Sequence, residues 1–235
     1  MNKLLFIIGS RNESSRNYTL TNKLISKLNE LEDISFEFEI VTPDKIELND
    51  CRGCLSCFET GNCPLDYSNG DCGLSLKSKL KQADFIIVNS PVYAHSVSGD
   101  VKRIIDRLSY WLHTFELLGK QGIVLTTTFS SGAEAVSDYL KKIMLHYGMF
   151  VPYTQNFYGF TSNNEIELML DSVTTYLHKF MKGEISLAAT PDQESFFQQL
   201  RHLYLFSDES NYEKQVWKKR GYLKAENFND LLNMK

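Results

Sequence analysis

The sequence has little of what would direct a protein to a membrane or to nucleic acid. No apolar run approaches the roughly 20 residues that a membrane-spanning helix needs. No block of like charge stands out, and 25 basic against 29 acidic residues give a net charge of −4. Electrostatics therefore supports neither nucleic-acid binding nor binding to a membrane surface, and we expect neither partner.

A secretory signal is also lacking. Residues Met1-Asn2-Lys3 lead into an apolar run at 4–8, which is too short for the apolar part of a signal peptide. A mid-sized chain without such a signal points to the reducing cytosol, where structural disulfides are rare. We therefore expect a cytoplasmic protein, and its 235 residues suffice for one domain with an extension.

The usual glycine motifs for phosphate binding are missing as well. The apolar run 4–8 predicts a buried strand, but neither a G-x-G-x-x-G sequence nor a Walker loop follows it. A segment rich in Ser and Asn follows instead, at 9–19, and then a helix with leucines on one face. Backbone N–H groups and the dipole at such a helix N-terminus favour an anion. Because similar segments also cap helices without any ligand, this segment alone leaves both interpretations open.

Strand and helix patterns alternate along most of the chain. Apolar runs and alternations predict strands at residues 4–8, 35–41, 84–89, 122–128 and within 150–160. Apolar residues at helical spacing predict helices after residue 19, at 73–82, at 100–111, after residue 132 and at 165–181. This order predicts a doubly wound parallel sheet with helices on both faces, in which the strand at 35–41 lies nearer an edge.

A shorter helical part follows this alternating unit. We predict a main domain at 1–182, a linker at 183–192 within a C-terminal extension at 183–235, and an amphipathic helix at 194–206. Ser210-Asn211-Tyr212-Glu213 resembles a capping box that opens a second helix. The extension is too small to fold alone, so we expect it to pack on the main domain or on a second subunit.

Four of the five cysteines lie in one short stretch with the spacing C-x2-C-x2-C-x5-C. Such spacing lets the sulfurs of Cys51, Cys54, Cys57 and Cys63 converge on one centre, and thiolate shells hold iron–sulfur clusters or structural zinc. We favour a single 4Fe–4S cluster, because the first two gaps are those of a bacterial ferredoxin run and a second run is missing. Zinc and a metal-free loop remain alternatives, and Cys72 is expected to be an ordinary loop thiol.

Three loops follow predicted strand ends, at 10–19, 91–99 and 127–132, where open α/β sheets bind their ligands. The first resembles the G-S-x-R-x-x-S phosphate loop of the NADPH-dependent FMN reductase family, in the flavodoxin-like superfamily. The second, S-P-V-Y-A-H-S-V-S-G-D-V-K-R-I-I-D-R, is similar to the family's signature P-x-Y-x-x-x-x-x-G-x-x-K-x-x-x-D-R. The cysteine stretch resembles the compact motif of iron–sulfur flavoproteins. The resemblance covers residues 1 to about 182.

The resemblance implies a flavodoxin-like sheet of five parallel strands in the order 2-1-3-4-5, with one FMN and one 4Fe–4S cluster per subunit of a homodimer or homotetramer. For the FMN phosphate it implies Ser10, Arg11, Ser15, Asn17 and Thr19, and for the ribityl chain and ring it implies Pro91, Val92, Tyr93 and Ala94. Ser98 and Gly99 would let backbone approach the flavin, and Thr128, Ser130 and Gly132 would face its pyrimidine edge. The cluster ligands that it implies are Cys51, Cys54, Cys57 and Cys63.

The implied activity is that of an FMN-dependent oxidoreductase and electron carrier. The cluster would exchange single electrons with a ferredoxin-like partner, and FMN would pass two electrons as a hydride to a small-molecule acceptor. No side chain is expected to act as acid or base, although His95 beside the second loop is a possible proton donor. One alternative is a cluster-free NAD(P)H-dependent FMN or quinone reductase. A second is a non-enzymatic binding module that zinc or a cluster stabilises.

Overall fold

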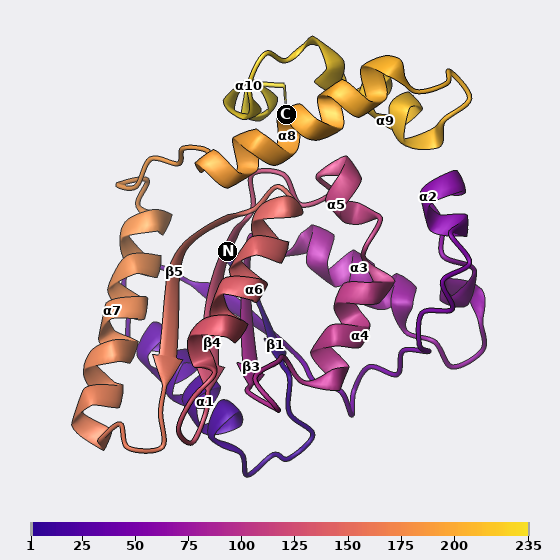
Figure 1. The fold of residues 1–235 in the computed structure, drawn as a ribbon. Coiled ribbons are helices and arrows are strands. Elements are labelled where there is room, and N and C mark those ends of the chain that lie inside the picture. Colours follow the sequence, from indigo (N-terminus) through magenta and orange to yellow (C-terminus); the bar gives the residue numbers. More distant parts are fainter. Residues whose placement is uncertain (1, 235) are drawn as a thin grey trace.

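The computed structural model describes residues 2–234, and its centre is a sheet of five parallel strands. The strands lie in the order β2-β1-β3-β4-β5, which confirms the predicted flavodoxin-like topology (Figure 1). Their bounds are β1 Asn2–Ile8, β2 Phe36–Val41, β3 Phe85–Pro91, β4 Gln121–Thr127 and β5 Phe150–Phe157. Ile8 of β1 pairs with Asn89 of β3, so the point where the strand order reverses lies between these two strand ends.

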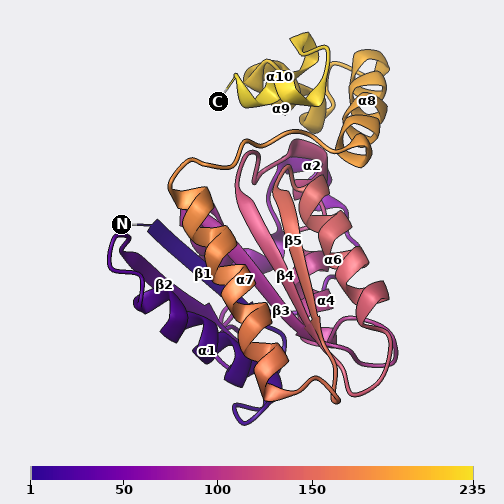
Figure 2. The ribbon, with the colours of Figure 1, turned by 90° about the vertical axis from the view of Figure 1, so that its left-hand side faces the viewer.

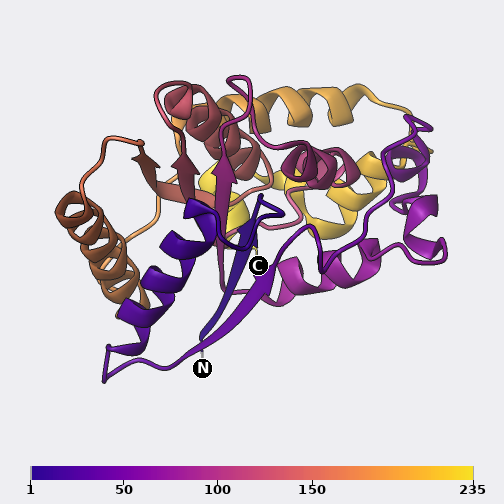
Figure 3. The same cartoon turned by 90° about the horizontal axis from the view of Figure 1, so that it is seen from below.

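Helices cover both faces of the sheet because side chains alternate along each buried strand. Leu4 and Phe6 of β1 share a core with apolar residues of α1 (Arg16–Asn29) and α7 (Asn163–Met181). Figures 2 and 3 show these two helices on the same face of the sheet. Leu5 and Ile7 belong to the core on the other face, which is covered by α3 (Gly73–Gln82), α4 (Gly99–Arg107) and α6 (Ala133–His146). Within residues 2–234, no helix combines the length and apolar character needed to cross a membrane.

The helix predicted at 100–111 is shorter than expected. It ends as α4 at Arg107, and α5 (Trp111–Thr114) follows after three residues of turn. The backbone N–H of Trp111 donates to the carbonyl of Leu108 over 2.9 Å, which is the tighter hydrogen bond of a turn. The neighbouring Tyr110 and Trp111 are both buried. The turn at 108–110 thus separates two helices where the helical spacing predicted one, and the side chains on either side of it stay in the core.

The cysteine stretch is more ordered than the loop that its spacing suggests. It contains the short helix α2 (Ser56–Thr60) and the 3₁₀ helix η1 (Pro64–Tyr67). Helix α2 lies between left-handed residues, Leu55 before it at φ 61° and Gly61 after it at φ 75°. In Figure 1, α2 lies apart from the sheet, beside α5 and α9.

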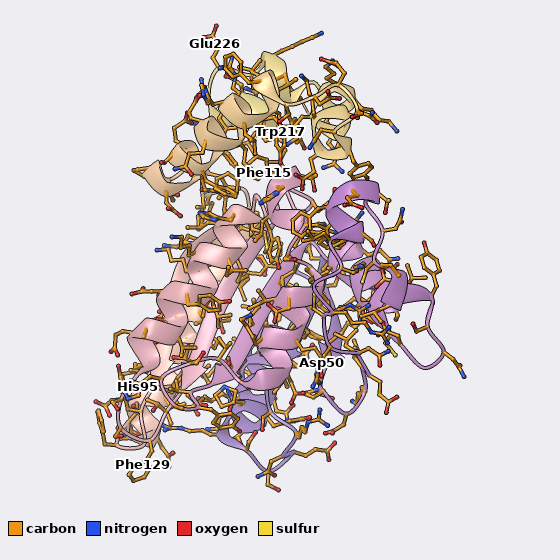
Figure 4. All side chains as sticks on the ribbon, turned by 45° about the vertical axis from the view of Figure 1, so that its right-hand side comes forward. Asp50, His95, Phe115, Phe129, Trp217 and Glu226 are labelled. Atoms are coloured by element: carbon orange, nitrogen blue, oxygen red, sulfur yellow. The ribbon has the colours of Figure 1, made fainter. Side chains whose placement is uncertain are left out.

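The C-terminal extension forms its own small core. It contains α8 (Pro191–Phe206), α9 (Tyr212–Arg220), η2 (Tyr222–Lys224) and α10 (Phe228–Leu232), beyond the amino-terminal ends of the strands (Figure 1). Its buried Trp217 packs against Phe115, which belongs to the connection between α5 and β4 (Figure 4). Asn211 caps α9 by accepting from the N–H of Lys214, so the predicted cap at Ser210 was wrong by one residue. The extension thus packs on the main part of the chain, as one of the two predicted alternatives has it, whereas the boundary at 182 stays a prediction.

Candidate functional site

A cavity of about 560 Å³ opens at the carboxyl ends of the strands, where the predicted ligand loops meet. Its walls come from the first residue of α1 and from the loops after β3, β4 and β5. The residues that line it include Arg16, Tyr93, Thr128, Phe129 and Thr161. His95 and Phe129 lie together at this end of the molecule (Figure 4). The predicted residues Pro91, Val92 and Thr128 also line this cavity.

The first loop offers a hydroxyl that has no partner. Ser15 is the N-cap residue of α1, but its side chain makes no capping hydrogen bond. Its Oγ is buried and lacks a hydrogen-bond partner among the described residues. Buried polar atoms are almost always hydrogen-bonded, so an orphaned hydroxyl at a helix N-terminus fits an anionic ligand such as a phosphate. Ser10, by contrast, is used locally, since its Oγ accepts from the N–H of Asn12 over 3.2 Å.

The structure separates the roles of two neighbouring arginines. Arg11, which sequence analysis proposed as a phosphate ligand, makes a two-pronged ion pair with Asp100 at 2.7 and 3.0 Å. Its side chain is not among those that line the cavity. Arg16 does line the cavity, and it donates to the backbone carbonyls of Tyr158 and Thr161. Burial lowers the pKa of Arg16, and no carboxylate in residues 2–234 forms an ion pair with it.

The sequence alone did not lead us to predict Arg16 as a residue of this cavity. A cation in the first turn of a helix is disfavoured by the helix dipole. The position of Arg16 at the start of α1, directly after Ser15, was the signal that could have indicated an anionic ligand.

Asn17 joins the strand ends. Its Nδ2 donates to Oδ1 of Asn89 at the end of β3 over 2.6 Å, and its Oδ1 accepts from Thr127 of β4 over 2.8 Å. Asn89 returns a hydrogen bond to Thr21 over 3.1 Å. The side chain of Asn17 is thus occupied in a buried network that fixes three elements at the edge of the cavity. Thr19 likewise donates to the carbonyl of Ser15, over 3.3 Å.

The second loop makes a tight reversal at the cavity. Tyr93 and Ser96 exchange backbone hydrogen bonds of 2.9 and 3.0 Å. Between them Ala94 and His95 have φ values of 49° and 59°, as a type I′ turn requires. Non-glycine residues in this region are strained, and such strain gathers at ligand sites. The turn leaves the Tyr93 side chain 57% exposed beside the cavity.

The same loop leads into α4 and packs on the loop after β1. Ser98 caps α4 by accepting from the N–H of Val101 over 3.3 Å. A Cβ on Gly9 would lie 2.6 Å from Val101 Cγ2, so only glycine allows this close approach, and sequence analysis did not single it out. A Cβ on Gly99 would meet nothing within 4 Å, which leaves open space at the start of α4.

The third loop, at 127–132, packs closely on the second loop, at 91–99. Gly132 has φ 86°, and a Cβ there would lie 2.9 Å from Nδ1 of His95 and 3.1 Å from Val92 Cγ1. Thr128 donates to the carbonyl of Ser131 over 2.7 Å, so its hydroxyl shapes the loop. Ser130 and Phe129 are exposed. The two loops therefore form one unit, and Gly132 is the residue that permits their contact.

The four cysteines lie at increasing depth. Cys51 and Cys54 are exposed, Cys57 is half-buried and Cys63 is buried. Burial raises the pKa of the Cys57 thiol, and the nearby sulfurs of Cys63, Cys51 and Cys54 raise it further. Hydrogen bonds from Ser56 lower the pKa of Cys54. In donor chemistry, a set of four cysteine thiols fits a 4Fe–4S cluster.

The four cysteine side chains are not, however, arranged as the ligands of one metal centre. In the stretch from residue 2 to residue 234, no three or more His, Cys, Asp or Glu side chains form a group that could hold a metal ion. Cys72 precedes α3, and its backbone N–H donates to the carbonyl of Glu47 over 2.8 Å. The cluster and its ligands thus stay a prediction.

A buried network of charged side chains links the segments on either side of the cysteine stretch. Arg107 at the end of α4 is paired with Asp66 at 2.7 Å and with Asp71 at 2.6 Å, and its side chain is 1% exposed. It also donates to the carbonyl of Asn49 over 3.0 Å, so it joins the chain before Cys51 to the chain after Cys63. Desolvation opposes the charge of Arg107, but hydrogen bonds to Asp71 and the nearby Cys63 sulfur raise its pKa overall.

Comparisons with known proteins agree with this geometry. An iron-sulfur flavoprotein of Archaeoglobus fulgidus is 31% identical over 138 residues, which are 58% of this chain and 61% of the relative. The matched stretch is therefore less than two thirds of that protein. An iron-sulfur flavoprotein of Methanocaldococcus jannaschii is 34% identical over 151 residues, which are 63% of this chain and 75% of the relative.

Solved structures share the fold at low identity. RosB, solved with the bound intermediate 8-demethyl-8-formylriboflavin-5'-phosphate, superposes on this chain with a TM-score of 0.62 at 15% identity. The superposition covers 89% of this chain and 89% of RosB. An azoreductase from Bacillus anthracis gives 0.57 at 14% identity, over 76% of this chain and 100% of that one.

The family comparison covers all three loops and the cysteine stretch. The model of the family described as NADPH-dependent FMN reductase matches residues 2–161, which include β1 to β5 and the cavity loops up to Thr161. The resemblance found in the sequence is thereby confirmed. Because this match spans more than half of the chain, the chain belongs to the NADPH-dependent FMN reductase family.

Proposed function

We propose that the protein is an FMN-dependent oxidoreductase that also carries a 4Fe–4S cluster on Cys51, Cys54, Cys57 and Cys63. Membership of the family supports FMN and NAD(P)H. The names of the relatives in Archaeoglobus fulgidus and Methanocaldococcus jannaschii support the cluster. In this proposal the protein links one-electron donors to two-electron chemistry.

The observation that carries the flavin part is the start of α1. Ser15 has a buried hydroxyl without a partner, and Arg16 beside it is a cation without a carboxylate partner among the described residues. Together with the free N–H groups at a helix N-terminus they suit a phosphate of charge near −2. In this proposal Ser15 and Arg16 hold the FMN phosphate, and the predicted ligand Arg11 acts on the loop through Asp100.

The remaining residues shape the flavin site. Tyr93 offers an exposed aromatic surface at the cavity, and the turn at Ala94 and His95 holds it there. When bound, FMN supplies hydride chemistry and a cluster supplies single-electron exchange. The side chains are left with binding, orientation and exclusion of water, so no acid or base is assigned.

The partners follow from this chemistry. We propose a ferredoxin-like protein or NAD(P)H as electron donor and a small molecule as acceptor. A homodimer or homotetramer remains the prediction that the resemblance implies, as does a cytoplasmic location.

One observation favours a second candidate. Because no group within residues 2–234 has metal-ligand geometry, a cluster-free NAD(P)H-dependent FMN or quinone reductase deserves testing beside the first. The non-enzymatic binding module differs from both, since it would bind no flavin.

The test is to purify the full chain without oxygen and to measure its visible spectrum, flavin, iron and sulfide. Bound FMN with about four irons per chain is the expected result. FMN without iron after reconstitution would leave the cluster-free reductase. Protein that binds no FMN, even when FMN is added, would overturn the proposal, and zinc in place of iron would favour the binding module.

A further inference from the structure

Helix α2, which carries Cys57, is too short to be stable on its own. It has five residues and none of them is buried. Isolated helices shorter than about 12 residues are marginal in water, so the position of α2 must depend on contacts with other elements. Its Cys57 and Phe58 pack on the edge of the core that α3, α4 and α6 cover. On its other side lies α9 of the C-terminal extension, as Figures 1 and 3 show. Helix α9 lies outside the residues that match the family model.

The first contact joins Tyr212 at the start of α9 to Gly61 at the end of α2. A Cβ on Gly61 would lie 2.0 Å from Oη of Tyr212 and 2.3 Å from its Cζ. The phenol ring therefore occupies the space that only a glycine leaves free. Gly61 lies between Cys57 and Cys63 in the sequence, so Tyr212 rests on the part of the chain that sets the separation of these two sulfurs.

The second contact runs through His113 of α5. The ring of Phe58, which follows Cys57, packs on the ring of His113 at a centroid distance of 5.3 Å. Nδ1 of His113 lies 3.0 Å from a carboxylate oxygen of Glu213, and Trp217 donates to the carbonyl of His113 over 2.7 Å. Tyr204 of α8 donates to the same carboxylate over 2.8 Å.

These contacts form a continuous support from the core of the extension to the cysteines. Trp217 and Tyr204 are fully buried, so the support starts from a fixed core. It reaches α2 at both Phe58 and Gly61, on either side of the end of the helix.

We propose that the C-terminal extension is the outer wall of the cysteine site, and that Tyr212 is a positioning residue that holds the segment from Cys57 to Cys63. This inference rests on the proposed function, in which these cysteines bind a cluster. The extension is then a part of the metal site, and its removal exposes the two deeper sulfurs.

The test compares the wild type with Tyr212→Ala in the full chain. In metal-free, reduced protein, alkylation of each cysteine by iodoacetamide is followed by peptide mass spectrometry. Cys57 and Cys63 are expected to react about fivefold faster or more in Tyr212→Ala, the scale of one lost aromatic contact. The exposed Cys51 and Cys54 serve as internal references whose rates should hardly change.

Two control variants separate positioning from a general loss of stability. Tyr212→Phe keeps the ring on Gly61 and should behave as the wild type. Lys219→Ala changes an exposed residue of the same helix and should also have no effect. Near-ultraviolet circular dichroism confirms that each variant is folded.

A second measurement uses the iron-loaded protein. Iron release to a ferrous chelator should be about fivefold faster in Tyr212→Ala than in the wild type. A wild-type protein that takes up no iron would contradict the proposed function. The alkylation rates would still test whether Tyr212 positions the segment from Cys57 to Cys63. If Cys57 and Cys63 are alkylated at the wild-type rate in Tyr212→Ala, the inference is overturned, whether or not the wild type binds iron. If the wild type binds iron, an unchanged rate of iron release in Tyr212→Ala also overturns the inference.

Discussion

Arg107→Met is the substitution that tests the charge network under the cysteine stretch most directly. Methionine keeps most of the aliphatic stem but removes the guanidinium that joins Asp66, Asp71 and the carbonyl of Asn49. The side chains of Asp66 and Asp71 are 4% and 0% exposed, so water does not replace the lost partner. We expect a large loss of stability.

The structure sets the size of that loss. Removing one partner of a buried ion pair costs about 3–5 kcal/mol, because the other charge is left buried. Here Asp66 keeps Lys77, and Asp71 keeps the N–H groups of Asn49 and Gly73, both at 2.8 Å. These remaining partners place the expected loss near the lower end, at about 3 kcal/mol in the free energy of unfolding. For a domain of this size that is a fall in Tm of roughly 6–12 °C.

The assay is urea unfolding of the metal-free, reduced protein, followed by circular dichroism. Arg103→Met is the matched control, because Arg103 lies one helical turn earlier and pairs with Asp50, whose side chain is 82% exposed. Its second partner, Asp100, keeps the ion pair with Arg11. Exposed pairs contribute about 1 kcal/mol or less, so this variant should unfold close to the wild type. Adding Asp71→Asn to Arg107→Met should recover part of the loss, since it neutralises the stranded carboxylate. A loss below about 1 kcal/mol for Arg107→Met would refute the reasoning.

Three further predictions concern other parts of the candidate sites. Cys63→Ser should abolish cluster assembly whereas Cys72→Ser should leave iron content unchanged, and equal iron content in both variants after anaerobic reconstitution would contradict the ligand assignment. Ser15→Ala should weaken FMN binding by about 1.5–3 kcal/mol, or roughly 10- to 100-fold in Kd, as a lost hydrogen bond to a charged group would. An unchanged Kd by fluorescence titration would remove Ser15 from the phosphate site. Asp71 is expected to make stability fall in acid: desolvation alone would raise its pKa, but hydrogen bonds from Arg107 and from backbone N–H groups hold it at about 2, below the ordinary 3.8. The unfolded chain therefore binds this proton first, so the contribution is present above pH 3.8 and is lost as pH falls towards 2. Asp71→Asn should flatten urea midpoints over that interval, and a profile parallel to the wild type would count against it.

Much of the fold followed from local pattern. The apolar run of β1 and the alternation of β2 predicted a central strand and an edge strand. The order β2-β1-β3-β4-β5, which the family resemblance implied, is confirmed. Residues that decide between strand and helix are neighbours in the chain, so their spacing carries this information. The spacing failed at the end of α4, where a turn at 108–110 takes the place of the predicted helix up to Trp111.

The candidate sites divide in the same way. The sequence by itself indicated which loops reach the carboxyl ends of the strands and which four cysteines share a stretch, because both depend on residues close together in the chain. Only the tertiary structure brought Asn17 to Asn89 and Thr127, set Arg107 between Asp66 and Asp71, and laid Tyr212 on Gly61. These contacts join residues that lie far apart in the sequence, and their geometry is fixed by how whole elements pack, which no local pattern records.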